Sequence, residues 1–266
     1  MGDQTPAPRR RGGRPAVGEP LLDRAFRLLG AFTEDDPTLS LGELSAKTEV
    51  PLSSTLRIGQ HLVRLGALER LPDGRFTIGL RMLNFAALAP RGHGLRAIAL
   101  PYMEDLHRAT RQHVQFAVRE KDEGVIVERL SAPGAGRVLY HAGGRFPLHG
   151  TSLGIVMLAY ARPEFRAAYL TRPLVLEPEN LPVDTAALRA QLDETRSRGV
   201  ATFSRVLPEP AEAIAAPVFD RDGECIAALS VLAGDGTVDL RSAEPAVIAI
   251  ARAISRDVAR TRLPAD

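Results

Sequence analysis

Several common features are missing from this sequence of 266 residues, and each absence narrows the classes to which the protein can belong. Cys225 is the only cysteine, so no intrachain disulfide can form, and a reducing compartment such as the cytoplasm is expected. No apolar run reaches the roughly 18 residues that suggest a membrane-spanning helix. Four arginines near the N-terminus are not followed by an apolar segment, so a secretory signal is not expected.

The usual signatures of catalysis and metal binding are missing as well. The sequence has no Walker loop, no dinucleotide-binding fingerprint and no pair of carboxylates at catalytic spacing. None of the six histidines has another four residues away. His141 and His149 flank an expected turn and could meet a metal, although surface or capping roles are commoner. Cys225 is interpreted as a buried, inert thiol, with a redox sensor as the alternative. We therefore expect no catalytic residue, no metal and no cofactor.

Residues 39–79 have the pattern of a winged helix-turn-helix, a fold that usually places one helix in the major groove of DNA. Ser40 and Glu43 form the signature of a capping box, which predicts a first helix over residues 42–48. This helix should end before Pro51, because the residue before a proline is pushed out of the helical region. From Leu52, apolar residues recur at helical spacing until Gly66, which predicts a second, longer helix.

A hairpin should follow the second helix. Residues 67–71 and 75–78 have strand patterns and flank the turn Pro72-Asp73-Gly74, which would be the wing. Residues 47–91 hold seven Lys/Arg against three acids, whereas residues 19–43 hold six acids against two arginines, an asymmetry typical of a face that meets phosphate. The alternative is a packing module that does not touch DNA. The residues expected at DNA are Ser53, Ser54, Thr55, Arg57, Gln60 and His61 on the second helix, and Arg75 on the wing.

The rest of the chain is expected to form an arm, a linker and a second domain. Residues 1–20 are rich in Pro, Gly and Arg and should be disordered. Within them, Arg10-Arg11-Gly12-Gly13-Arg14-Pro15 resembles an AT-hook core with one extra glycine, and is either a solvated tail or a basic arm that assists DNA binding. Residues 80–88 should form an apolar helix and residues 89–92 a linker. The expected boundaries are 1–20 for the arm, 21–79 for the winged helix, 80–94 for the linker helix and 95–263 for the second domain.

The second domain mixes strand and helix patterns in the order expected of an α+β sandwich around one antiparallel sheet. Such an architecture suits a small-molecule pocket better than an open active-site cleft, although a domain that only dimerises is an alternative. The predicted strands are 113–119, 124–130, 137–140, 200–203, 213–219 and 225–232, and the predicted helices are 95–109, 151–161, 185–198 and 243–260.

The segment Gly150-Thr151-Ser152-Leu153-Gly154 has two functional interpretations. It matches the G-x-S-x-G motif of esterase-like hydrolases, which would make the protein an enzyme. However, no histidine follows Ser152, and Pro147 and His149 interrupt the strand that should lead to it. The favoured interpretation is a glycine-rich turn at a helix N-terminus, where unpaired N–H groups attract a carboxylate effector. A helix cap without a ligand remains the third alternative.

Three segments together resemble the IclR family of bacterial transcription regulators, over residues 21–263. They are the helix-turn-helix itself, the segment GGRFPLHGTSLGIVMLAYARPE, and the combination of RGV with AIAAPVFDRDGECIAALSV. The resemblance implies a winged helix, a GAF-like effector-binding domain, and DNA binding as a dimer or a dimer of dimers. It implies effector contacts at Gly150, Thr151, Ser152, Leu153 and Gly154, with Ser230 on a pocket-lining strand.

One segment departs from the family pattern. Where the family usually has an acidic pair, this chain has Arg205-Val206, and Pro210 replaces a common glycine. This favours an anionic effector with an apolar body, such as a small aromatic or branched organic acid. The predicted function is a cytoplasmic, sequence-specific transcription regulator that binds a pseudo-palindromic operator as a homo-oligomer and responds to that acid. Apolar walls are expected from Phe116, Val118, Leu139, Ala215, Leu229 and Val231.

Overall fold

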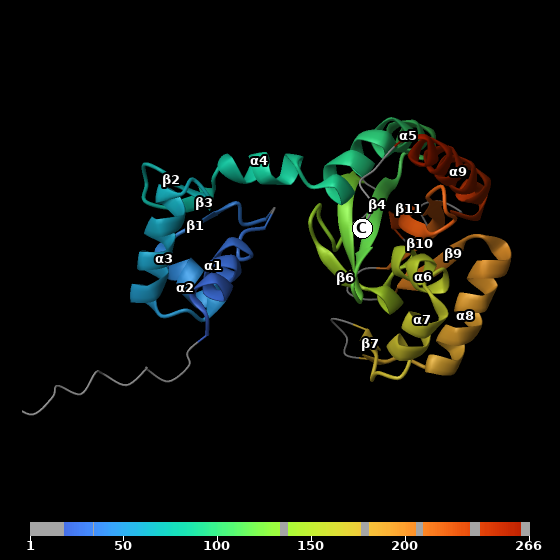
Figure 1. Cartoon of the computed structure of the whole chain (residues 1–266), viewed down its shortest axis with the longest axis horizontal. Helices are drawn as coiled ribbons and strands as arrows, with labels where there is room; N and C mark the ends of the chain where they lie inside the picture. Colours follow the sequence, from blue (N-terminus) through green and yellow to red (C-terminus); the bar gives the residue numbers. More distant parts are fainter. Residues whose placement is uncertain are drawn as a thin grey trace, which may run out of the picture. The chain divides into compact units, whose positions relative to one another are not determined.

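The computed structural model of the chain describes residues 19–33, 35–133, 138–176, 181–205, 210–234 and 240–261. The expected N-terminal arm lies outside these residues except for Glu19 and Pro20. The chain forms two compact units, Met1–Phe85 and Ala86–Asp266 (Figure 1). The first contains a helix-turn-helix and the second an antiparallel sheet covered by helices, which confirms the predicted fold class.

The N-terminal unit packs helices against a small antiparallel sheet, as a winged helix requires. One strand of this sheet was not expected, because its two residues are too few to show the alternation by which strands are recognised. The helices are α1 (Leu21–Leu29), α2 (Leu41–Thr48) and α3 (Leu52–Arg64), and the strands, in sheet order, are β1 (Thr38–Leu39), β3 (Phe76–Ile78) and β2 (Leu68–Arg70).

Local chemistry sets the boundaries of the helix-turn-helix. Ser40 N donates to Glu43 Oε2 over 2.7 Å and Glu43 N donates to Ser40 Oγ over 3.3 Å, so the predicted capping box is present. α2 ends at Glu49, whose φ of 55° is left-handed and cannot continue a helix. The core beneath the helices is formed by Leu28, Leu39, Leu44, Val50, Ile58, Leu62, Leu68 and Phe76.

The segment after the wing is largely helical. α4 (Arg81–Ala87) is followed by a π-helical turn over Pro90–Gly94, which runs directly into α5 (Leu95–Thr110). Residues 80–94 were predicted as a linker helix, and the linker expected over residues 89–92 includes the start of this π-helical turn. Pro90 fits the first turn of a helix because its missing N–H would have no intrahelical partner there.

The C-terminal unit is built on an antiparallel sheet with the order β6-β5-β4-β11-β10-β9. The predicted strand over residues 137–140 is wrong for residues 138–140, which do not form a strand, and Arg137 lies outside the described residues. The sheet edge is formed instead by residues 145–147, which had been expected to be a turn. The strands are β4 (His113–Glu120), β5 (Glu123–Leu130), β6 (Arg145–Pro147), β9 (Ala201–Arg205), β10 (Ala211–Phe219) and β11 (Cys225–Gly234).

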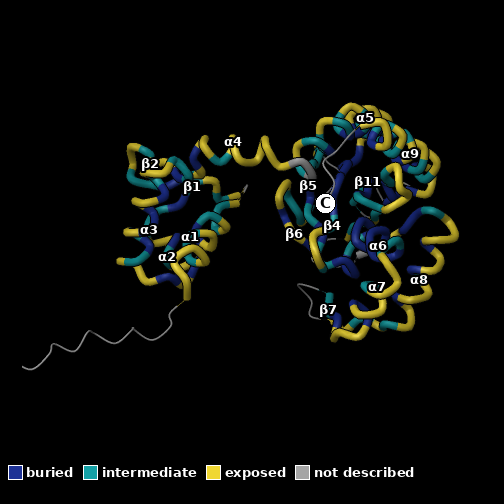
Figure 2. Tube along the Cα trace, viewed as in Figure 1, coloured by how far each residue is buried: buried dark blue, intermediate teal, exposed yellow. Residues whose placement is uncertain are grey.

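Helices cover both faces of this sheet (Figure 1). α5 and α9 (Glu244–Arg260) pack on one face, against larger side chains such as Phe116 and Leu229. α6 (Ser152–Ala159) packs on the other face, against alanines of the same strands, and α7 (Pro163–Tyr169) and α8 (Thr185–Arg198) lie outside it. α7 and the small hairpin of β7 (Val175–Leu176) and β8 (Leu181–Pro182) were not predicted. Figure 2 shows that α6 is buried, whereas α8 is largely exposed.

Membrane insertion can be judged from the helices of the described residues. Among these, none combines the length and the apolar character needed to cross a bilayer.

Candidate functional site

Two surfaces hold the predicted site residues, and the first is the outer face of α3. Residues at helical spacing are buried on one side of this helix, so the remaining positions form a continuous exposed face. Most of the residues predicted to meet DNA lie on that face. Ser53, Arg57, Gln60, His61 and Arg64 are exposed, and Ser54 is half-buried.

Thr55 does not lie on the exposed face, so the expectation that it contacts DNA is wrong. Its side chain is fully buried, and its hydroxyl donates to Val50 O over 2.9 Å. The same hydroxyl lies 3.2 Å from Pro51 O. Thr55 shares the buried side of α3 with Ile58 and Leu62, because residues three and four apart fall on one side of a helix. Its role is to fasten the turn to α3.

Arg75 on the wing is engaged within the protein. Its Nε donates to Thr38 Oγ1 over 3.1 Å and its Nη2 donates to Thr38 O over 2.6 Å. Nη2 also lies 3.5 Å from the Glu43 carboxylate. These contacts join the wing to β1 and to the start of α2, so a DNA contact by Arg75 stays a prediction.

The second surface is a pocket at the N-terminus of α6. Thr151 is the N-cap of this helix, and its Oγ1 accepts a hydrogen bond from Gly154 N over 3.0 Å. The N–H groups of Ser152 and Leu153 belong to the first helical turn, where a helix has no internal acceptors for them. The positive end of the helix dipole therefore faces the pocket, and a carboxylate there would be stabilised.

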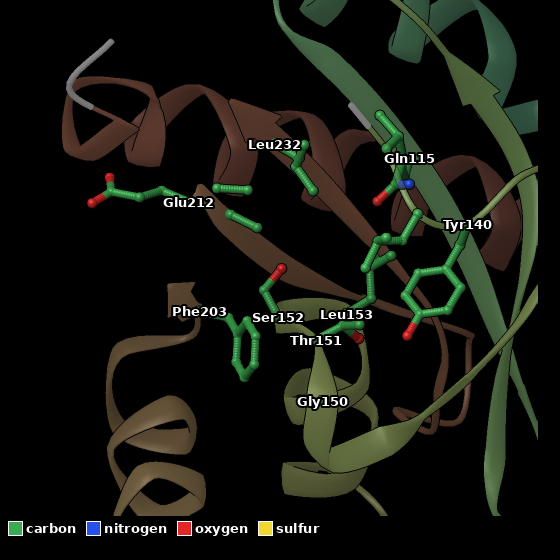
Figure 3. Close-up of a pocket in the computed structure, with 13 residues that line it drawn as sticks. Gln115, Tyr140, Gly150, Thr151, Ser152, Leu153, Phe203, Glu212 and Leu232 are labelled. Carbon is green, nitrogen blue, oxygen red and sulfur yellow. The ribbon is translucent and has the colours of Figure 1, made fainter. Parts of the chain in front are cut away.

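The pocket extends from α6 to the facing side of the sheet (Figure 3). Its empty space amounts to about 660 Å³, a figure that includes the open solvent at its mouth. Figure 3 shows the Glu212 carboxylate pointing away from Ser152, so this acid does not oppose an anion at the helix. The pocket is lined by Gln115, Val138, Leu139, Tyr140, Gly150, Thr151, Ser152, Leu153, Phe203, Ala211, Glu212, Ala213 and Leu232.

Two of the predicted effector residues are not among those that line the pocket. Gly154 is buried under the preceding turn, and a Cβ at this position would collide with Leu148 O. Ser230 lies on β11, directly opposite Gln115 on β4, and is 1% exposed. Gly154 thus allows close packing, and Ser230 stands next to a lining residue. Their contact with an effector stays a prediction.

Buried polar atoms without a partner occur next to this pocket. Gln115 is 4% exposed, and its Nε2 has no hydrogen-bond partner; the same is true of Ser230 Oγ. A buried polar atom of this kind lowers the stability of the protein unless a ligand or water forms the missing hydrogen bond. These two atoms therefore mark the side of the pocket where a further partner is missing.

The predicted apolar walls are partly wrong. Leu139 lines the pocket, and Ala215 lies on the same face of the sheet as the lining residue Ala213. The other four belong to the opposite face, which packs on α5 and α9, because alternate residues of a strand point to opposite sides. They are Phe116, Val118, Leu229 and Val231. The lining residues Gln115 and Phe203 were missed for the same reason, since strand register was not known from sequence, and Tyr140 was missed because it lies in a segment that was predicted as a strand.

His149 holds the turn that leads into the pocket. Its Nδ1 lies 2.8 Å from the Tyr169 hydroxyl and its Nε2 lies 2.8 Å from Val175 O. Both ring nitrogens are thus occupied, which leaves none for a metal ion or for activating Ser152. Among the described residues, no group of three His, Cys, Asp or Glu side chains is arranged to hold a metal.

The remaining chemical candidates concern Cys225 and Arg205. Burial raises the pKa of the Cys225 thiol from 9.0 to about 12, so the reactive thiolate is suppressed, as an inert thiol requires.

Arg205 is the last residue of β9. Its side chain and residues 206–209 lie outside the part of the chain that the structure describes. An anionic effector, favoured by Arg205 in place of an acidic residue, therefore stays a prediction.

Comparison with known families matches most of the chain. Residues 21–72 match the IclR helix-turn-helix domain, and residues 88–260 match the domain described as bacterial transcriptional regulator IclR C-terminal. Among curated relatives, the HTH-type transcriptional regulator KipR of Bacillus subtilis is 28% identical over 78% of this chain and 83% of that protein. The Pca regulon regulatory protein of Pseudomonas putida is 27% identical over 89% of this chain and 82% of that protein.

Solved structures give the same result. An IclR homologue from Microbacterium hydrocarbonoxydans, crystallised in complex with 4-hydroxybenzoate, is 30% identical, with a TM-score of 0.78 over 91% of this chain and 100% of that one. The IclR protein of Thermotoga maritima is 20% identical and shares the fold, with a TM-score of 0.71 over 90% of this chain and 98% of that one.

Proposed function

This chain belongs to the IclR family of bacterial transcriptional regulators, and we propose that its effector is a small carboxylic acid with an apolar body. As a member of the family it is a DNA-binding regulator with an N-terminal helix-turn-helix and a C-terminal effector domain. The observation that carries the proposal is the pocket between the N-terminus of α6 and the sheet, with N–H groups at one end and mainly apolar walls elsewhere.

The relative with a bound ligand supports this class of effector. The Microbacterium protein was crystallised with 4-hydroxybenzoate, a small aromatic acid, and its chain is covered completely by this one at 30% identity. In our chain, Tyr140, Phe203 and Leu139 supply walls that would pack on an aromatic or branched body. A sugar or polyol would leave many of its hydroxyls without partners against these walls.

We place the DNA contact on the exposed face of α3. Arg57, Gln60 and His61 are side chains that reach phosphates and base edges, and they lie together on that face. Ser53 begins the same face at the end of the helix that would enter the major groove. One such helix reads only a half-site, so specificity requires at least two copies on a pseudo-palindromic operator.

The surface of the chain supports assembly into a homodimer or homotetramer. α1 and the α4 segment expose large apolar side chains that are costly to leave in water. Burying them against a second copy would remove that cost. They are Leu22, Phe26, Leu80, Leu83, Phe85 and Leu88.

The effector would act by binding one arrangement of the dimer more tightly than another. A differential affinity worth about 1–3 kcal/mol is enough to change operator occupancy measurably. The protein then works in the cytoplasm, where its DNA lies, and it carries out no catalysis. The pocket itself counts against a regulator that dimerises without a ligand.

A gel-shift assay on the promoter fragment upstream of the gene for this protein, with and without a panel of carboxylic acids, tests the proposal. We expect at least one aromatic or branched acid to change the shift, and Ser152→Leu to remove the response while leaving DNA binding intact. Calorimetry with neutral sugars and amines is the control. Tight binding of a neutral or cationic ligand that Ser152→Leu leaves unchanged would contradict the proposal.

A further inference from the structure

We propose that Gln115 recognises a second polar group on the effector, an oxygen that accepts a hydrogen bond and lies across the pocket from the carboxylate. This inference rests on the proposed function, because it takes the carboxylate to lie at the N-terminus of α6. It goes further by assigning a donor to the other end of the ligand. The effector is then a hydroxy or oxo acid, and a simple hydrocarbon acid is a poor substitute.

The Gln115 amide is buried and has an unused hydrogen-bond donor. Gln115 lines the pocket from β4, its residue is 4% exposed, and its Nε2 lacks a hydrogen-bond partner. Figure 3 shows its side chain on the side of the pocket opposite Thr151 and Ser152. A buried N–H₂ group without an acceptor is unfavourable in the empty protein, and a ligand oxygen would remove that cost.

No side chain of the described residues accepts a hydrogen bond from this amide. Its neighbours along the lining include Val138, Leu139 and Leu232, which are apolar. Ser230 lies directly opposite Gln115 in the β4–β11 pairing, and its own Oγ is also unpartnered. Two adjacent side chains on one face of the sheet therefore each lack a partner, and a ligand oxygen would supply the acceptor that the amide lacks.

The ligand oxygen that Gln115 binds should be uncharged. None of the described lining residues is a lysine or an arginine. A second carboxylate at Gln115 would lose its hydration, which is costly in a buried site, and the neighbouring Arg129 on β5 already donates to Tyr140 O. A neutral oxygen, such as a phenol, an alcohol or a carbonyl, meets the need of the amide without this cost. Dicarboxylates should therefore bind more weakly than monocarboxylates with a neutral oxygen.

Isothermal calorimetry on the full chain with matched acids tests the inference. The pairs are benzoate with 4-hydroxybenzoate and phenylacetate with 4-hydroxyphenylacetate, and terephthalate serves as the dicarboxylate. In any pair that the wild type binds, we expect the hydroxylated acid to bind about five- to ten-fold more tightly, the range of one hydrogen bond. Gln115→Leu should remove this difference. Gln60→Leu, on the exposed face of α3, should leave it unchanged.

The outcomes separate this inference from the proposed function. If acids bind but the hydroxylated members have no advantage, or if the advantage survives in Gln115→Leu, the role of Gln115 is wrong and the proposed effector class stands. Tighter binding of terephthalate than of 4-hydroxybenzoate would also contradict it. If the folded protein binds none of these acids, nor any other carboxylate of the panel, the proposed function fails and takes this inference with it.

A separate observation concerns the helix that faces DNA. Leu52 is the first residue of α3 and is 53% exposed, next in sequence to the exposed Ser53, which lies one turn before Arg57. We infer that Leu52 contacts the methyl group of a thymine in the operator. The N-terminal residues of a recognition helix contact base edges, and the C5-methyl of thymine is the apolar group that the major groove presents. Leu56, half-buried one turn further along, extends the apolar strip.

Replacing thymine by deoxyuridine tests this contact, because it removes only the methyl group. Duplexes that the protein selects from a random pool are compared with copies in which single thymines are replaced. We expect one replacement per half-site to weaken binding about three- to four-fold in the wild type, the value of one buried methyl group, and not in Leu52→Ala. Leu65→Ala is the matched control, since Leu65 is also 53% exposed but follows the end of α3.

Two results would overturn the inference. One is that no single deoxyuridine weakens binding by the wild type. The other is that Leu52→Ala retains the effect, or that it changes the oligomeric state in light scattering, which would assign Leu52 to a protein interface.

Discussion

The Tyr169 hydroxyl donates a hydrogen bond to Nδ1 of His149 over 2.8 Å, immediately before the turn that opens the pocket. The direction of this bond follows from the other ring nitrogen. Nε2 lies 2.8 Å from Val175 O, and a carbonyl only accepts, so Nε2 carries the proton and Nδ1 accepts. His149 therefore joins the pocket turn to α7 on one side and to β7 on the other.

Removing the Tyr169 hydroxyl should weaken this connection. In Tyr169→Phe, Nδ1 of a buried histidine loses its donor, and we expect the free energy of unfolding to fall by about 1–3 kcal/mol. Urea unfolding followed by circular dichroism measures the change. Tyr160→Phe is the comparison, because the Tyr160 ring packs edge-on against Phe219 and that contact survives the substitution. An equal loss of unfolding free energy in both variants would show that the hydrogen bond to His149 does not stabilise the fold.

Thr55 and Ser53 should have opposite effects although they are two residues apart on α3. Thr55→Val keeps the shape of the buried side chain but removes the donor to Val50 O, so stability should fall by about 1–2 kcal/mol. Ser53→Ala should leave the unfolding midpoint unchanged and weaken binding to the promoter fragment. Thermal unfolding and fluorescence anisotropy, run on both variants, decide the assignment. The reverse pattern would place Thr55, and not Ser53, at the DNA.

Arg57 should contribute directly to DNA recognition. Arg57→Ala is expected to weaken specific binding by about 1–3 kcal/mol. If the side chain contacts a phosphate, the slope of log affinity against log salt should also fall by about one. Arg221→Ala, in the exposed turn between β10 and β11, removes the same charge from the other unit and should change neither quantity. Wild-type affinity in Arg57→Ala would remove this side of α3 from the interface.

The Cys225 thiol should resist modification while the protein is folded. Its pKa is raised from 9.0 to about 12 by burial, so the neutral thiol is favoured in the folded state. The unfolded chain ionises first as the pH rises, and the folded state loses stability between pH 9 and pH 12 but not below pH 9. Reaction with a disulfide reagent at pH 8 should therefore be slow until urea unfolds the protein. Rapid reaction in the native state would revive the redox-sensor alternative.

The exposed apolar residues of α4 should matter for assembly. Leu83 is 61% exposed and Phe85 is 57% exposed. If a second copy of the chain covers them, a charge at either position would prevent the two copies from binding. We expect Leu83→Glu to lower the mass seen by light scattering and to weaken operator binding together. A monomeric wild type at micromolar concentration, even with operator present, would contradict the assembly that we propose.

Elements with strong local signals were predicted well. The capping box at Ser40 and Glu43, and the turn around Gly74, have chemistry that does not depend on the rest of the fold, and both lie where the sequence predicted. β6 had no such signal, because it is three residues long and pairs at the edge of the sheet through backbone groups. Its location depends on β5, which only the folded sheet provides.

The pocket was predicted less completely than the exposed face of α3. Helical spacing alone gives the exposed side of α3. Thr55 was wrongly predicted to be exposed, because a threonine hydroxyl can also be buried when it donates to a backbone carbonyl. The pocket requires the face of each strand, and a shift of one residue exchanges the two faces. Phe116 was chosen for its apolar ring, whereas its neighbour Gln115 faces the pocket.

The side of the sheet beneath α6 is made of alanines, and this limits how the pocket can evolve. Ala117, Ala215 and Ala228 are fully buried there, and Ala211 and Ala213 continue the row to the pocket. Alanine already has the smallest side chain that a strand tolerates well, since glycine would weaken the strand. Mutations in this floor can only shrink the cavity, so a variant selected for a bulkier ligand must gain its space at the larger lining residues, such as Phe203 or Leu139.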